Sequence, residues 1–321
     1  MAITVALAGD TMLGRKVAER IGRAGPRSLV AAEVRDVVAG ADLFLVNLEC
    51  CISDRGSRWP APGKPFHFRA PPAAVETLRW LGVTDVTLAN NHALDYGTDA
   101  LTDTRRLLTG AGIRVIGAGD DHAQARAATS IEVAGLRIAL VGLTDHPPDF
   151  AATQNRPGVA YADLRAGVPP GLRRQVRDLR AAHDIVLVTP HWGPNMTTEP
   201  EPYVVDAAQV LLGDGATVVA GHSAHVFHGV ADRILFDLGD FVDDYLVDGR
   251  LRNDLGMLWL LTLDRSGPMR LRAIPLALDY CFTRLADRAE YAWIAARFAR
   301  ACAAFGHEVH DFGDELVVSW V

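Results

Sequence analysis

The 321-residue chain has few of the features that mark secreted, disulfide-rich or nucleic-acid-binding proteins. It has four cysteines, none in a CxxC pair, which argues against both a disulfide framework and a cysteine-based zinc site. Lysine is almost absent, with only Lys16 and Lys64, and the net charge is −7. Without a run of basic residues, we expect no nucleic-acid partner.

Long hydrophobic runs are also missing, so the sequence predicts no membrane span. The first apolar strand begins within a few residues of Met1, which leaves no room for a signal peptide. We therefore expect a cytoplasmic protein without a membrane partner. Hydrophobic residues make up 49% of the chain, enough to bury the core of one large α/β domain over residues 1–321.

Apolar and amphipathic segments alternate along most of the chain, which favours parallel strands with helical crossovers. We expect strands near residues 3–8, 42–48, 83–88, 113–116, 137–143, 185–189 and 216–220. We expect helices near residues 13–24, 27–39, 71–81, 98–110, 168–182 and 202–212.

The later apolar runs lack intervening helices. Residues 233–238, 255–264 and 269–278 are therefore expected to form antiparallel strands of a second sheet. Residues 246–321 would complete that sheet and add a helix near 286–304 and a closing strand near 315–320.

Polar residues follow the apolar strands at several strand ends. The most informative is the turn that contains Asn91, His92 and Asp95, directly after the apolar run that ends at Leu88. Strand ends are where open α/β sheets build sites, because the strand fixes the loop that carries the chemistry. The residues of this kind that we expect as metal ligands are Asp10, Glu49, Asn91, His191, His222 and His225. Oxygen and imidazole ligands without thiolate suit iron, manganese or zinc.

Each of these residues also has a plain structural explanation. An Asp after a strand is usually a helix cap or a turn former, and a lone His near a core is usually just hydrogen-bonded. The recurrence at five strand ends is hard to attribute to turn chemistry, so we favour a metal site.

The ordered series of motifs resembles the CapA-type family, the bacterial poly-γ-glutamate capsule synthesis family within the calcineurin-like metallophosphoesterases. The resemblance covers roughly residues 3–245. The motifs that carry it are Gly9-Asp10 with Met12-Leu13-Gly14-Arg15, Asn47-Leu48-Glu49, Phe68-Arg69-Ala70-Pro71, Ala89 to Gly97, His191-Trp192-Gly193, and Gly221-His222 with His225.

The resemblance implies a four-layer α/β/β/α sandwich of two mixed sheets that holds two metal ions about 3.5–4 Å apart. Asp10 and His225 would bind one metal, Glu49 would stand at the bridging position, and the other three ligands would bind the second metal. His92 would not be a ligand but would approach the leaving group. Asp95 would orient the His92 ring and stabilise its charged form.

The sequence departs from the superfamily pattern in two places. The usual Asp-x-His start is missing, because Met12 stands two residues after Asp10. His67, His146 and His228 are candidates for the missing imidazole, and each has the alternative of an ordinary surface or supporting histidine. Asp240 stands where CapA-like chains usually carry Asn, and it either orients a ligand histidine or simply ends a strand.

Two long irregular segments, residues 51–72 and 147–157, follow strand ends, and such loops are often functional. The first could bring basic side chains to an anionic substrate, although a merely solvated loop is an equal alternative. These basic side chains are Arg55, Arg58, Lys64, His67 and Arg69.

Three functions remain open for this sequence. The first is a dinuclear hydrolase of a phosphoester, ester or amide, in which a metal-bridged hydroxide attacks a small-molecule substrate with an anionic group. The second is a non-haem diiron oxygenase or other oxidoreductase on the same scaffold. The third is an accessory or amide-assembly role in the biosynthesis of a γ-linked polyamide, which the family resemblance implies.

Overall fold

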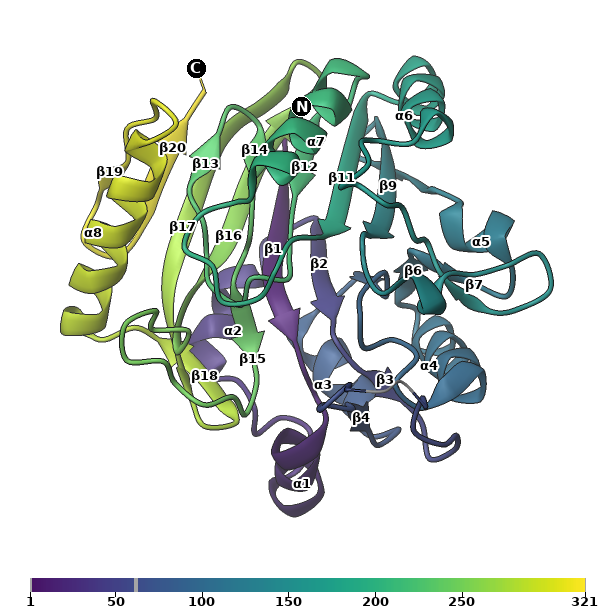
Figure 1. Ribbon diagram of the computed structural model, residues 1–321. Coiled ribbons are helices and arrows are strands. Elements are labelled where there is room, and N and C mark those ends of the chain that lie inside the picture. The colour runs from purple at the N-terminus through teal and green to yellow at the C-terminus, as the bar shows by residue number, and fades with distance from the viewer. Residues whose placement is uncertain (1, 61–62, 321) are drawn as a thin grey trace.

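The computed structural model describes residues 2–60 and 63–320. Two mixed β-sheets face each other, and helices cover the outer face of each sheet (Figure 1). The expected four-layer α/β/β/α sandwich is thus confirmed. Within the described residues, no helix is long and apolar enough to cross a membrane, and all four cysteines are buried and unpaired.

The first sheet is built around its central strand β1 (Ile3–Thr11), which pairs in parallel with β2 (Leu43–Leu48) and antiparallel with β16 (Leu255–Asp264). The other strands of this sheet are β5 (Asp85–Thr87), β6 (Arg114–Ile116), β15 (Asp240–Val242), β17 (Gly267–Asp279), β18 (Phe282–Leu285), β19 (His310–Asp311) and β20 (Leu316–Ser319).

The second sheet has β11 (Ile185–His191) at its centre, parallel to both β9 (Leu136–Thr144) and β12 (Val218–Ala220). Its remaining strands are β8 (Thr129–Val133), β13 (Val230–Ala231) and β14 (Ile234–Leu235). Two small two-stranded sheets lie apart from the large ones, and they consist of β3 (Cys51–Ile52) with β4 (Arg69–Ala70), and β7 (Ala118–Gly119) with β10 (Gly158–Val159).

The expected sheet membership of the late strands is wrong. β16 and β17 extend the first sheet, because β16 pairs with the free edge of β1, so residues 246–321 do not complete the second sheet. β14 does lie in the second sheet, but it runs parallel to β12. Periodicity reports which faces of a strand are buried, and it carries no information on which sheet edge the strand joins.

Helices cover the two outer faces and one side of the sandwich. Those on the first sheet are α1 (Arg15–Ala24), α2 (Ala32–Val38), α3 (Ala74–Leu81) and α4 (Gly97–Gly110). Those on the second sheet are α5 (His122–Arg126), α6 (Pro170–Ala182) and α7 (Pro202–Gly213), and a 3₁₀ turn spans Pro148–Phe150. The last helix, α8 (Arg288–Ala303), packs against β17, β16 and β13.

Alternation along the strands divides the core into three apolar layers. On β1, Val5 and Leu7 face the second sheet, while Ala6 and Ala8 face the helices. Phe298 of α8 belongs to the middle layer, so α8 closes the side of the sandwich. Burying a side chain of this size stabilises the fold by roughly 1.5–3 kcal/mol. The paired sheets therefore form a rigid frame whose strand ends hold the polar residues.

Candidate metal centre

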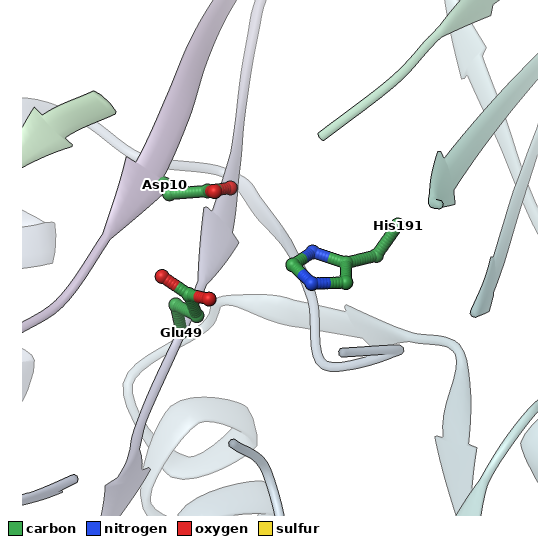
Figure 2. A group of neighbouring side chains, drawn as sticks. All are labelled: Asp10, Glu49 and His191. Carbon is green, nitrogen blue, oxygen red and sulfur yellow. The ribbon is translucent and has the colours of Figure 1, made fainter. Parts of the chain in front are cut away.

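Buried acidic and imidazole side chains meet where the two sheets face each other at their carboxyl ends. Asp10, Glu49 and His191 form one group, and Asp10, His225 and Asp240 form another, and within each group the candidate ligand atoms lie within 4.8 Å of one another. Figure 2 shows the first group, whose side chains come from three strand ends and point toward a common space. Asp10 is the carboxylate that the two groups share.

The strand register brings these residues together. β1 and β2 run in parallel with Asp10 opposite Asn47, so Glu49 leaves β2 close beyond Asp10. His191 is the last residue of β11 in the facing sheet, and it forms an isolated parallel bridge with His222. His222 Nδ1 in turn lies 3.4 Å from Asp10 Oδ1.

A close backbone approach at Gly9 places Asp240 beside Asp10. A Cβ at Gly9 would lie 1.7 Å from the carbonyl oxygen of Gly239, so no other residue fits there without moving the backbone. The Asp10 amide donates to that same oxygen at 2.9 Å, and Asp10 is the register partner of Asp240. Glycine at this position therefore sets the separation of the two carboxylates.

Six buried side-chain atoms of Asp240 and of five expected ligands lack a hydrogen-bond partner in the part of the chain that the structure describes. They are Asp10 Oδ2, Glu49 Oε1, Asn91 Oδ1, His191 Nε2, His222 Nδ1 and Asp240 Oδ2. Buried polar atoms nearly always have partners, and each unsatisfied one costs about 1–3 kcal/mol. All six carry lone pairs suited to a cation, so the residues fit the metal ions that the fold family implies.

The carboxylates lie in a strongly perturbed electrostatic environment. Burial opposes ionisation of Asp10, yet contacts from His222 and His225 outweigh it and hold the pKa of that carboxyl well below its usual range. Burial raises the pKa of Glu49 well above its usual range, and the charge of Asp10 adds to the effect. Burial likewise raises the pKa of Asp240. Mutual repulsion of this kind is relieved when a cation binds between the carboxylates.

His225 contacts two carboxylates, and its backbone adopts a strained conformation. Its φ of 59° lies in the left-handed region, which is costly for a residue with a side chain. His225 Nδ1 lies 2.9 Å from Asp240 Oδ1 and 3.3 Å from Asp10 Oδ2. Burial lowers the pKa of His225, but Asp240 and Glu49 outweigh that effect and raise the pKa well above its usual range.

His92 and Asp95 form a hydrogen-bonded pair next to the centre. His92 Nδ1 lies 2.6 Å from Asp95 Oδ2, which also accepts from the Phe68 amide at 2.6 Å. Lys64 Nζ lies 3.1 Å from Asp95 Oδ1 and donates to the Asn91 carbonyl at 2.8 Å. Lys64 therefore ties the turn that carries Asn91 and His92 to the preceding loop.

The His92 ring is buried and presents its other nitrogen to the centre. Burial lowers the pKa of His92 to about 4, although Asp95 acts in the opposite direction. Because the Asp95 carboxylate faces Nδ1, the neutral ring carries its proton there and leaves a lone pair on Nε2. Nε2 lies 4.0 Å from Glu49 Oε1.

The three candidates for the missing imidazole occupy different places. The His146 ring centre lies 5.3 Å from that of His191, whereas one ring nitrogen of His67 and one of His228 contact backbone carbonyls of loop residues. The side chain that stands beside Asp10 and His225 is instead Asp240. The hypothesis that Asp240 orients a ligand histidine agrees with its contact to His225.

Two contacts at the centre were missed in the sequence. Asn47 Nδ2 donates to Asp10 Oδ1 at 2.7 Å and lies 3.2 Å from His191 Nδ1, so it positions both side chains. The Tyr245 hydroxyl donates to Glu49 Oε2 at 3.2 Å. Asn47 lies near the end of β2 and precedes Glu49 by two residues, the spacing that puts side chains on one side of an extended segment, and this signal could have identified it. No pattern marks Tyr245.

The two long loops contact each other beside the turn. Trp59 Nε1 donates to Asp149 Oδ2 at 2.7 Å, and the Trp59 ring packs edge-on against Phe150 with 5.2 Å between ring centres. The first loop is less irregular than expected, since its ends pair as β3 and β4. Residues 61 and 62 of this loop lie outside the described residues.

Comparison with known sequences gives a family match over most of the chain. The family model described as "Bacterial capsule synthesis protein PGA_cap" matches residues 4–245. A Mycobacterium tuberculosis protein named "Probable polyglutamine synthesis accessory protein" is 30% identical over 365 aligned residues, covering 98% of this chain and 95% of that protein. The "PGA biosynthesis protein CapA" of Bacillus subtilis is 28% identical over 280 residues, covering 85% of this chain and 71% of its own.

Comparison with solved structures supports the fold. A structure described as a novel phosphatase from Mycoplasma pneumoniae aligns with a TM-score of 0.53 and 14% identity, covering 91% of this chain and 97% of that chain. A hypothetical protein from Thermus thermophilus aligns with a TM-score of 0.50 and 17% identity, covering 85% of this chain and 98% of that chain. At these identities the likeness concerns the fold alone.

Proposed function

The chain belongs to the bacterial capsule synthesis protein family, and from that membership we propose that it is a metal-dependent hydrolase that acts in the synthesis of a γ-linked polyglutamate. The names of the relatives support a role in polymer synthesis better than they support a free-standing phosphoesterase. The observation that carries a catalytic role is the set of six buried, unpartnered ligand atoms at the strand ends. Buried polar atoms usually have partners, so this set supports a bound metal, and a metal beside the His92–Asp95 pair supports chemistry.

The proposed ligands fall into two sets that share Asp10. Asp240 and His225 complete one set, in which Asp240 takes the place of the absent Asp-x-His imidazole. Glu49 and His191 belong to the other set, together with Asn91 and His222 on the basis of their unpartnered atoms. Asp10, which belongs to both sets, would then help to hold both ions, a place that the family resemblance gives to Glu49. Two bound metal ions supply Lewis acidity and neutralise negative charge that develops on the substrate.

His92 is the proposed proton carrier. Its Nε2 lone pair takes a proton from the attacking water, and the same atom then delivers that proton to the leaving group. Asp95 stabilises the imidazolium formed in between, through the 2.6 Å contact to Nδ1. Lys64 fixes the carboxylate of Asp95 from the other side at 3.1 Å, and thereby positions the ring.

An amide is the proposed bond, because a γ-linked polyglutamate is joined by amide bonds. Hydrolysis adds water across the bond: hydroxide goes to the carbonyl carbon and a proton goes to the departing nitrogen. An amine is a poor leaving group until it is protonated, which makes a positioned proton carrier such as His92 valuable for this reaction. An aryl phosphate, with its more acidic leaving group, depends on such a residue much less.

The test compares two model substrates on protein loaded with manganese, zinc or ferrous iron. We expect cleavage of a γ-glutamyl anilide, and a loss of about a hundred-fold or more in His92→Gln with bound metal retained. His310→Gln, at an exposed position far along the chain, is the matched control. Cleavage of an aryl phosphate alone would overturn the amide assignment. A visible iron absorption band with oxygen consumption would instead support the oxidoreductase alternative.

A further inference from the structure

A cavity of about 360 Å³ opens beside the metal centre and has no assigned role. We call it the arginine cavity, and its polar and aromatic lining consists of Arg15, Arg58, Phe66, His67, Arg69 and Tyr96. No acidic side chain lines it. On a chain whose net charge is −7, this is a local concentration of positive charge.

One layer of aromatic rings separates the arginine cavity from the centre. The guanidinium carbon of Arg15 lies 4.9 Å from the Phe68 ring centre, and the Phe68 ring stacks on His92 at 4.0 Å. Arg15 also lies 5.4 Å from the Tyr245 ring, whose hydroxyl donates to Glu49. A ligand that fills the cavity is therefore a close neighbour of the proposed proton carrier.

The basic residues around the cavity differ in whether their charge is already compensated. Arg15 pairs with Asp244, Arg55 with Asp103 at 2.7 Å, and Lys64 with Asp95 at 3.1 Å. These pairs hold the surrounding loops and α1 in place.

Arg58 and Arg69 are different. Among residues 2–60 and 63–320, no carboxylate oxygen lies within 4.0 Å of either guanidinium group. Arg69 donates to the Arg55 carbonyl at 3.2 Å and stacks on Tyr96, with its guanidinium carbon 4.2 Å from the ring centre. Stacking and the backbone contact fix the guanidinium plane of Arg69, which lines the cavity, and leave it donors that no carboxylate within the described residues engages.

We propose that the arginine cavity binds an anionic group of the substrate, a carboxylate or a phosphate, that is remote from the bond cleaved at His92. The inference rests on the proposed function and names the recognition element of the same site. Guanidinium groups match such oxyanions with paired hydrogen bonds. A second anchored charge selects substrates with several anions in a row over small single esters or amides.

The test measures binding by calorimetry on metal-loaded protein, with γ-linked tetraglutamate and inorganic tripolyphosphate as the two probes. We expect the double variant Arg58→Gln with Arg69→Gln to bind at least one probe about ten-fold or more weakly. The control is Arg23→Gln with Arg27→Gln, which removes the same charge from exposed positions and should change binding less than about two-fold. The probe that responds distinguishes a carboxylate from a phosphate ligand.

Equal binding by the wild type and the arginine variant, or an equal loss in the control, would overturn the proposal. Arg58 is exposed, so Arg58→Gln alone keeps the test available when the double variant folds poorly. Metal content and anilide turnover are measured on the same samples. The protein could retain no metal and show no turnover, yet bind a probe more weakly in the arginine variant. That result would overturn the proposed function and leave the cavity assignment intact. Anilide turnover together with a probe affinity that is unchanged in the arginine variant would overturn the cavity assignment and leave the proposed function intact.

Discussion

The buried acids of the metal centre and the buried Asp214 differ in what neutralises their charge. Asp214, at the end of α7, receives hydrogen bonds from Arg173 and Arg177 of α6. At the metal centre, by contrast, Asp10, Glu49 and Asp240 have no lysine or arginine within 4.0 Å in the part of the chain that the structure describes. Their polar side-chain partners within residues 2–60 and 63–320 are imidazoles, the Asn47 amide and the Tyr245 hydroxyl.

We attribute a structural role to Asp214 and the proposed metal-binding role to the acids of the centre. A buried charge is costly unless it is paired and hydrogen-bonded. Asp214 carries its own counter-ions and joins two helices, so it stabilises the fold without any outside group. The centre has three carboxylates and only imidazoles as basic partners, an arrangement that a bound cation would stabilise further. Acidic residues at the two places should therefore respond in opposite ways to substitution and to metal.

The largest effect is expected for Asp10→Ala on metal-loaded protein. Because Asp10 belongs to both ligand groups, its loss should disrupt both metals and lower anilide turnover more than about a thousand-fold. Changes outside the ligand shell already cost about 10–100-fold in metal affinity. Steady-state kinetics of Asp10→Ala and Asp214→Asn measure the contrast, because Asp214→Asn should keep wild-type turnover. Similar losses in the two variants would erase the distinction between the clusters.

A smaller effect is expected when metal is added to the metal-free wild type. At a free metal concentration about 100 times the dissociation constant, binding should stabilise the folded state by about 2.7 kcal/mol for each occupied site. Urea unfolding with and without chelator measures this difference. Asp214→Asn should gain the same increment, and Asp10→Ala should gain almost none. An unchanged unfolding midpoint in the wild type would show that the centre has no need of a cation.

The smallest effect is expected for Asp214→Asn itself. This substitution should lower the free energy of unfolding by about 1 kcal/mol at pH 7, the upper end of the range for solvent-accessible ion pairs. The hydrogen bond from Arg173 is the main cause that lowers the pKa of Asp214. Its contribution is thus present above the unfolded pKa of about 3.9 and lost as the pH falls through the folded pKa. Urea unfolding at pH 7 and near pH 3 should show the gap closing, and a gap that widens toward low pH would reverse the assignment.

The sequence predicted the centre better than the sheets. Asp10, Glu49 and His191 stand at the ends of apolar strands, and parallel strands bring such ends to one edge, so their meeting followed from local pattern. The addition of β16 to β1 did not follow, because an apolar strand is compatible with either sheet. Asp240 stood out in the sequence only as a departure from the family pattern, and its place beside Asp10 depends on the close backbone approach at Gly9. Tyr245, three residues after β15, reaches Glu49 through a tertiary contact that no local pattern marks.

The most direct test of the central claim is the metal content of the purified protein after loading and removal of free metal. We expect two metal ions per chain in the wild type and in Asp214→Asn, and fewer than one in Asp10→Ala. Plasma mass spectrometry on samples of known protein concentration gives these ratios. A wild type that retains no metal, or an Asp10→Ala variant that retains two ions, would contradict the account.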